Sequence, residues 1–381
     1  MIDCGCIYED NLFKKYRRKF IKLEKAGTVH INLKEQSFDS RGIVALVNDI
    51  AYVINLYKSG CKRFVFYCRN FCPEDKLTYI LFEMLMYDLR INRGYDVILS
   101  IQNVKNKIST EGIKDSSLGY LLKSDEVYAK KFIFEQNTMH FRRIITKCQL
   151  EGAGISSVLG ELKIFFLTSS LNREKTDQIA KTISELIDNV GEHTDADCLI
   201  DIDIDITQTP YTKIGEQQRE YYAVNTVVLN LDEKKLSNNI REKVKNKYFG
   251  NSQRYQMVTD AYNNHKRFFD KHYNEEYFFN VVAFQDEISG RKYENQTGGT
   301  GLTQLIKSLE TDADDHGCYV LSGNQGLFFR PELLEYNEDR WLGFNKQKDF
   351  INKRPDELVI LRSNAYLRGT AYNFTLIYRK E

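Results

Sequence analysis

The residues whose types and spacing could do chemistry lie together in the stretch TISELIDNVGEHTD, residues 182–195. Glu185, Asn189 and His193 recur there at intervals of four, so on a helix they form one row beside an apolar stripe. Carboxylate and amide oxygens are ligands that Mg²⁺ prefers, usually together with substrate phosphates. A glutamate one turn from such a ligand can orient or deprotonate a water. The row therefore fits either the polar edge of an ordinary helix or a set of groups directed at a metal-bound nucleotide.

A glycine cluster later in the chain adds weight to the second interpretation. Residues 297–310, TGGTGLTQLIKSLE, place Gly298, Gly299 and Gly301 directly before an amphipathic helix. Successive backbone N–H groups at a helix start, together with the positive end of the helix, can cradle phosphates. A glycine turn is also a common helix cap, so the cluster indicates a phosphate site only in combination with the row on the earlier helix.

The elements that must position these residues follow from the hydrophobic pattern. In the first hundred residues a helix is expected over 41–60, between short β-branched or aromatic runs, and this alternation predicts a small parallel or mixed sheet. The strands expected there are 28–33, 63–68 and 95–101. Residues 102–154 are expected to form a helical connector, because 127–148 has helical periodicity.

The second half predicts two helices followed by a sheet. The helical patterns cover 156–170 and 175–194, and the strands expected are 198–209, 223–231, 317–329 and 369–379. Strict alternation of isoleucine with aspartate in 198–209 predicts one buried and one solvent-facing side, which puts Asp201, Asp203 and Asp205 on the surface. The sequence thus predicts an α/β protein with domains 1–101 and 155–381.

With these elements in order, the chain resembles the GHKL ATPase superfamily over about residues 155–381. ELIDNVGEH is similar to the N-box of that family, and GGTGLTQLI resembles its second glycine box. The resemblance implies the Bergerat fold: a mixed, largely antiparallel sheet with helices on one face, and ATP and Mg²⁺ between the helices and a lid. It implies Asn189 as the Mg²⁺ ligand and Glu185 as the general base. The residues that it implies for nucleotide contacts are Asn189, His193, Asp232, Gly298, Gly299, Thr300, Gly301, Leu302 and Thr370, with Asp232 and Thr370 at the adenine.

The chain departs from that family at its first glycine box, DxGxG. Asp232 stands at the position of the aspartate, but Lys234 and Leu236 replace the two glycines, so the backbone could not approach a base as closely. Thr303 stands where the second glycine box has a further glycine, and Glu192 where the N-box often has a lysine. Nucleotide could therefore bind weakly, bind in a shifted pose, or not be hydrolysed.

The N-terminal half is similar to a STAS domain of the anti-anti-sigma type, over about residues 25–101. The strand and turn in VHINLKEQSFDSRGIVALVNDI carry the resemblance. In that family a serine in the turn accepts phosphate from a partner kinase. Arg41 occupies that position here, and Ser40 is expected to cap the following helix.

Composition and local sequence context argue against several other classes of function. Lysine plus arginine (54) balances aspartate plus glutamate (53), which disfavours nucleic acid and anionic membranes as partners, despite the tyrosine- and phenylalanine-rich stretch 246–293. Eight cysteines in 381 residues are too sparse for a disulfide framework. His140 lacks the sequence context of a phosphoacceptor histidine. A cytoplasmic location is expected, because the chain begins without a signal-peptide pattern and contains no long apolar run.

The sequence supports three hypotheses about function. The first is an ATP- and Mg²⁺-binding regulatory switch, with slow ATPase activity as an option, that controls contact with an unidentified partner protein or a second copy of the chain in a bacterial regulatory or defence pathway. The second is an interaction scaffold that keeps the Bergerat fold without nucleotide. The third is a serine/threonine kinase of the anti-sigma type. The intact Glu185, Asn189 and glycine cluster favour the first, and the missing first glycine box favours the second.

Overall fold

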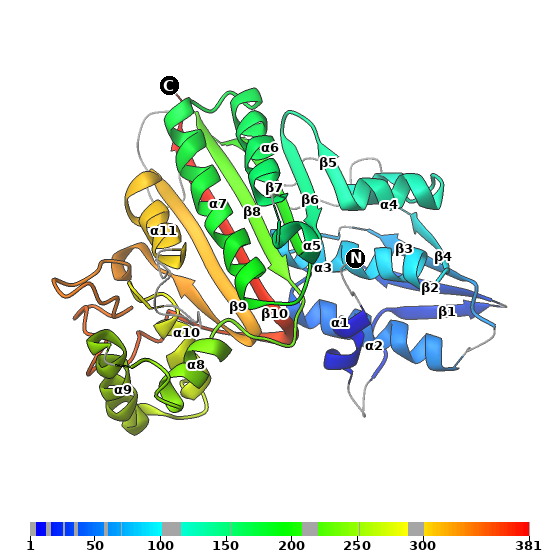
Figure 1. Ribbon diagram of the computed structural model, residues 1–381. Helices are drawn as coiled ribbons and strands as arrows, with labels where there is room; N and C mark the ends of the chain where they lie inside the picture. The colour runs from blue at the N-terminus through cyan, green and yellow to red at the C-terminus, as the bar shows by residue number, and fades with distance from the viewer. Residues whose placement is uncertain are drawn as a thin grey trace.

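The protein is a mixed α/β structure built on two sheets (Figure 1). The computed structural model describes residues 5–12, 17–25, 27–33, 37–56, 60–69, 71–100, 116–152, 154–207, 220–250, 252–288 and 301–380. Every helix within these ranges is too short or too polar to span a lipid bilayer.

The smaller sheet belongs to the N-terminal part. Its four strands lie in the order β1 (Ile21–Lys25), β2 (Thr28–Leu33), β3 (Arg63–Cys68) and β4 (Asp96–Ser100). The last three are parallel and β1 is antiparallel to β2. Buried and half-exposed residues alternate along β2, so one face of this sheet forms a core. The helices of this part are α1 (Gly5–Asn11), α2 (Ser40–Leu56), α3 (Lys76–Tyr87) and α4 (Asp125–Ile133).

The larger sheet has six antiparallel strands. Their order across the sheet is β5 (Phe134–Gln136), β6 (His140–Ile145), β7 (Cys198–Thr207), β8 (Tyr221–Asn230), β10 (Ile360–Arg379) and β9 (Asp315–Phe329). Three helices lie along one face, namely α6 (Gly154–Thr168), α7 (Arg173–His193) and α11 (Gly301–Lys307) (Figure 1). The short helix α5 (Lys147–Leu150) precedes α6. Outside the sheet lie α8 (Asn238–Lys245), α9 (Gln253–His265) and α10 (Glu275–Val282).

Both faces of the larger sheet are buried, because helix α3 covers the face opposite α7. On β8, Val224 and Val228 join the core beneath α6 and α7, whereas Val227 and Leu229 join the core of the N-terminal part. Helix α3 is buried along its whole length, and Phe82 on it contacts Phe66 of the smaller sheet. The N-terminal part is therefore joined to the larger sheet through a continuous apolar core.

The structure confirms most of the predicted elements and corrects two expectations. The predicted strands and helices from 28 to 101, and the helix pair before β7, are present with small shifts of their ends. The helical connector is wrong over residues 134–145, which form β5 and β6 of the larger sheet. The expected solvent-facing side of β7 is also wrong, because Asp201 and Asp203 are each only 1% exposed. Sheet pairing overrode the local helical periodicity, and the N-terminal part covers the aspartate side of β7.

Candidate functional site

Helix α7 presents the predicted row of polar residues at the edge of the core. The Asn172 side chain accepts a hydrogen bond from Lys175 N at 3.0 Å and caps the start of the helix. The predicted apolar stripe is buried: Ile179, Ile183, Leu186, Ile187 and Val190. Glu185, Asn189 and His193 are half-buried beside it. The predicted arrangement of the row on the helix is confirmed.

Asn189 stands out within this row. Its Nδ2 atom is fully buried and has no hydrogen-bond partner within the described ranges. One turn further on, His193 Nδ1 lies 3.5 Å from Asn239 Nδ2 on α8. The C-terminal end of α7 therefore carries a buried amide group that pairs with none of the described residues, close to the start of α8.

Asp232, the predicted adenine-binding aspartate, contacts backbone groups. Its Oδ2 accepts a hydrogen bond from Asp195 N at 2.6 Å, and its Oδ1 accepts one from Lys234 N at 3.2 Å. Lys234 Nζ donates to Asp195 at 2.6 Å. Asp232 thus ties the loop after β8 to the turn that follows α7.

Thr370, the predicted adenine-side threonine, lies in a row that crosses four strands. Cys198 pairs with Asn230, Asn230 with Thr370, and Thr370 with Ser322. Ser322 Oγ donates to Gly369 O at 3.0 Å, so the hydroxyl of Thr370 is the donor in the 3.2 Å contact between the two side chains. This row forms the end of the sheet beside the loop that carries Asp232.

Gly369 allows β10 to approach that loop closely. Its φ is +110°, and a Cβ atom there would lie 2.2 Å from Asn230 O and 2.8 Å from Asp232 N. Any other residue would be strained in its backbone and would collide with the neighbouring strand. Gly369, directly before Thr370, is therefore required by packing.

The predicted phosphate-binding segment is described only from Gly301 onward. Gly298, Gly299 and Thr300 lie outside the described residues. Gly301 begins α11, and Leu302 packs against the core beneath α6 and α7. Helix α11 contacts α7, and the hydroxyls of Ser308, just after α11, and Thr182 on α7 lie 2.5 Å apart. The structure therefore brings α11 against the helix that carries Glu185 and Asn189.

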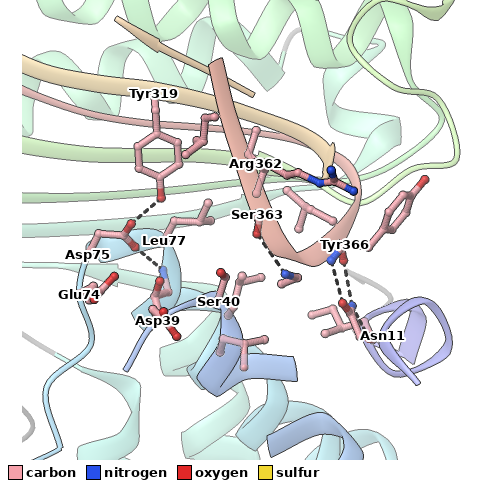
Figure 2. Close-up of a pocket in the computed structure, with 18 of the residues that line it drawn as sticks. Asn11, Asp39, Ser40, Glu74, Asp75, Leu77, Tyr319, Arg362, Ser363 and Tyr366 are labelled. Atoms are coloured by element: carbon pink, nitrogen blue, oxygen red, sulfur yellow. Dashed lines mark hydrogen bonds between the residues drawn. The ribbon is translucent and has the colours of Figure 1, made fainter. Parts of the chain in front are cut away.

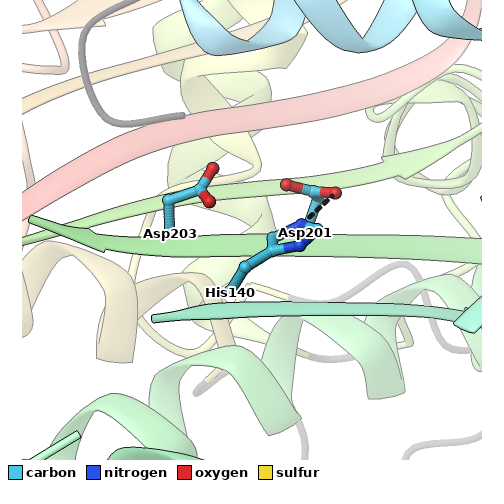
Figure 3. A group of neighbouring side chains, drawn as sticks. All are labelled: His140, Asp201 and Asp203. Atoms are coloured by element: carbon cyan, nitrogen blue, oxygen red, sulfur yellow. Dashed lines mark hydrogen bonds and ion pairs between the residues drawn. The ribbon is translucent and has the colours of Figure 1, made fainter. Parts of the chain in front are cut away.

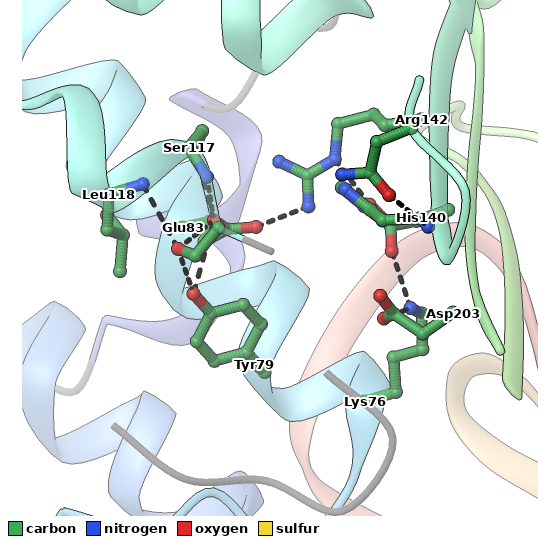
Figure 4. Close-up of polar contacts among 11 residues, drawn as sticks. Lys76, Tyr79, Glu83, Ser117, Leu118, His140, Arg142 and Asp203 are labelled. Carbon is green, nitrogen blue, oxygen red and sulfur yellow. Dashed lines mark hydrogen bonds and ion pairs between the residues drawn. The ribbon is translucent and has the colours of Figure 1, made fainter. Parts of the chain in front are cut away.

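A buried ionic network that the sequence pattern did not indicate lies on the other face of the sheet (Figure 4). Each of its six residues is at most 4% exposed: Lys76, Glu83, His140, Arg142, Asp201 and Asp203. Arg142 donates to Asp201 on β7 and to Glu83 on α3. Lys76 Nζ contacts Asp201 Oδ1 at 2.6 Å and also donates to Asp203. The network binds α3 to strands β6 and β7.

The charges in this network do not cancel if His140 is neutral, since three carboxylates face two cations. Burial alone would raise the pKa of Asp201, but Arg142 and Lys76 outweigh burial and hold that pKa well below its usual value. Burial raises the pKa of Asp203 above its usual value, although Lys76 opposes the shift. Of the two aspartates, Asp203 is therefore the one that takes up a proton more readily.

His140, Asp201 and Asp203 are also residue types that bind metal ions (Figure 3). Their ligand atoms lie within 4.8 Å of one another, and His140 Nε2 is 3.2 Å from Asp201 Oδ2. The ammonium group of Lys76 contacts both aspartates and already supplies a positive charge there. A divalent ion at this point would have to displace Lys76, so the geometry favours an ion-pair network over a metal site.

A pocket of about 260 Å³ lies where α1, α2 and α3 meet β9 and β10 (Figure 2). Its apolar lining includes Leu77 and Leu321, and its polar groups include Asp75, Tyr319 and Arg362. Tyr319 OH donates to Asp75 Oδ2 at 2.6 Å. The pocket therefore lies at the junction of the N-terminal part and the larger sheet.

The turn at the start of α2, which includes Asp39 and Ser40, also borders this pocket. Asp39 Oδ1 accepts from Arg41 N at 2.9 Å and Gly42 N at 3.1 Å, so Asp39 caps α2. The expectation that Ser40 caps the helix is wrong, because Ser40 is its first residue and its Oγ accepts from Asn364 N at 3.3 Å. The aspartate oxygen reaches the free N–H groups of the first turn, and the serine is left to contact β10.

In comparisons with known proteins, no protein-family model, no curated protein and no solved structure matches the chain.

Proposed function

We propose that the protein binds Mg·ATP between the C-terminal half of α7, the loop after β8 and the start of α11. It would act as a GHKL-type regulatory switch with slow ATP hydrolysis, and its nucleotide state would control contact with a partner protein. In this proposal Asn189 binds Mg²⁺, Glu185 orients the attacking water, and Thr370 lies at the adenine. The N-terminal STAS-like part, on the opposite face of the same sheet, would respond to the nucleotide.

The observation that carries this proposal is the buried amide of Asn189, whose Nδ2 finds no hydrogen-bond partner among the described residues. A buried polar group without a partner costs about 1–3 kcal/mol, so a ligand that pairs with this amide would recover that cost. Asn189 lies one turn after Glu185, on the helix against which α11 packs. A half-turn of the carboxamide exchanges Nδ2 and Oδ1, so the same side chain can face a phosphate oxygen or a metal ion.

Isothermal titration of the full chain with ATP, with and without Mg²⁺, tests the proposal. Wild type is expected to bind only with Mg²⁺, and Asn189→Ala is expected to weaken binding about tenfold or more, which corresponds to about 1.4 kcal/mol. Lys181→Ala is the matched control, since Lys181 is exposed on the same helix. Wild type that fails to bind Mg·ATP, or Asn189→Ala that binds as tightly as wild type, would overturn the proposal.

A nucleotide-free scaffold is the second candidate, and the contacts of Asp232 favour it. Both carboxylate oxygens of Asp232 already accept backbone hydrogen bonds, and Lys234 and Leu236 replace the glycines that would let a base approach. The same titration separates the two candidates, because a scaffold gives no heat with ATP at any Mg²⁺ concentration.

A further inference from the structure

Asn230 is a second buried amide without a partner among the described residues, and it lies at the same end of the sheet. Its side chain is 1% exposed, and Nδ2 has no hydrogen-bond partner in the described part of the chain. Side chains alternate between the two faces of a strand. Since Val224 and Val228 face the α6 and α7 side, Asn230 faces that side too.

The position of Asn230 is next to Thr370 and near the end of α7. The two residues are paired across β8 and β10, which places their side chains about 4.5–5.5 Å apart at Cβ on one face. Helix α7 ends at His193 and β7 begins at Cys198, which pairs with Asn230. Asn189 is four residues before the helix end, about 6 Å along the axis. Both unpaired amides therefore belong to the region between the end of α7 and the end of the sheet.

We infer that Asn230 is the base-recognition residue of the nucleotide site, with its carboxamide paired to the amino group and N7 of adenine. This inference rests on the proposed function. Asp232 is poorly placed for the role because its two oxygens hold the backbone N–H groups of Asp195 and Lys234. Asn230 offers a donor and an acceptor side by side, and neither Asp232 nor Thr370 offers both in that geometry.

The chemistry of the amide predicts a preference between purines. The N7 edge of adenine presents one donor and one acceptor, which matches a carboxamide, whereas the same edge of guanine presents two acceptors. A good bidentate pair of this kind discriminates by about tenfold or more. The site is therefore selective for ATP over GTP through Asn230, while Asn189 acts on either nucleotide.

The experiment is titration of the full chain with Mg·ATP and Mg·GTP. Wild type is expected to bind ATP about tenfold or more tightly than GTP. Asn230→Leu removes the amide while keeping the branching of the side chain, and it is expected to bring the ratio close to one. Thr226→Val is the control, because Thr226 lies on the same face of β8, is 0% exposed and has an Oγ1 that pairs with no described residue. Its ratio is expected to equal that of wild type.

Each outcome distinguishes the inference from the function on which it rests. If wild type binds neither nucleotide, both fail. If wild type binds Mg·ATP and Asn230→Leu keeps the wild-type ATP/GTP ratio, the inference fails and the proposed function stands. Equal loss of selectivity in Thr226→Val also overturns it. Circular dichroism checks that each variant is folded, and Asn230→Ala replaces the leucine variant if leucine does not fit.

Discussion

Replacing Lys76 with methionine tests whether the buried ionic network stabilises the junction of the two sheets. The Lys76 side chain is 4% exposed, and its ammonium contacts Asp201 and Asp203, which lie on one strand of the larger sheet. In Lys76→Met, Asp201 keeps its contact with Arg142, but Asp203 loses its cation. Removing one partner of a buried ion pair typically costs about 3–5 kcal/mol.

Asp203 can limit that loss by taking up a proton, and this makes the effect depend on pH. The usual pKa of an aspartate is 3.8, so protonation in the folded state costs about 4 kcal/mol at pH 7 and about 1.5 kcal/mol at pH 5. The free energy of unfolding of Lys76→Met is therefore expected to fall by about 4 kcal/mol at pH 7 and by roughly half of that or less at pH 5.

Urea unfolding at both pH values measures the change, with far-UV circular dichroism and the fluorescence of Trp341 as probes. Trp341 is the single tryptophan and is 1% exposed. The control is Lys163→Met, which removes an exposed ion pair with Asp177 and should leave stability unchanged. Lys76→Met/Asp203→Leu should recover most of the loss, since it removes both members of the Lys76–Asp203 ion pair. A loss below about 1 kcal/mol at pH 7, or one that is equal at both pH values, would refute the reasoning.

Two further predictions concern single carboxyl groups. Glu185→Gln is expected to bind Mg·ATP as wild type does and to lower any hydrolysis rate by about 10²- to 10⁴-fold, measured as phosphate release; equal rates would remove Glu185 from the mechanism. Asp201→Asn should destabilise the protein more than Asp203→Asn at pH 7, because the fold depresses the pKa of Asp201 and raises that of Asp203. Ionised Asp201 stabilises the fold above its usual pKa of 3.8, and this stabilisation is lost as pH falls through the lower pKa of Asp201 in the folded state. Ionised Asp203 has the opposite effect: it destabilises the fold as pH rises through the raised pKa of Asp203 in the folded state. Urea unfolding of both variants from pH 4 to 7 should therefore show that the free energy of unfolding of Asp203→Asn, relative to wild type, rises with pH. A fall with pH would contradict the raised pKa of Asp203.

Sequence periodicity predicted the elements that bury one face against the core and leave the other face polar. Helix α7 is an example, because its stripe from Ile179 to Val190 faces one sheet and its polar row lies at the edge. Strands β5 and β6 were missed because they are short and because β7, the second pairing partner of β6, begins more than fifty residues later along the chain. A local signal for their hairpin is present in Asn137, whose side chain accepts hydrogen bonds from Met139 N and His140 N at 2.9 Å.

The aspartates of β7 show why the candidate site was only partly predictable. Alternation of isoleucine with aspartate is the same pattern whether the aspartates meet water or meet buried cations. The decisive partner, Lys76, is 127 residues away from Asp203 in the sequence. Likewise, the unpaired amide of Asn230 follows from which face β8 turns toward α7, and this is set by the register of the sheet.

The two faces of the larger sheet are linked through the first part of β10. In the proposed function, Thr370 lies at the adenine. Four residues earlier on the same strand, Tyr366 N donates a hydrogen bond to Asn11 Oδ1 at 2.7 Å, and Asn11 Nδ2 donates one to Tyr366 O at 2.9 Å. Arg368, between them, donates to Asp10 on α1 at 2.8 Å. A change in β10 at Thr370 would therefore alter contacts that hold α1 and the pocket beside it. Under the proposed function, this connection lets the N-terminal part respond directly to bound ATP, because β10 both lies beside the adenine and anchors α1.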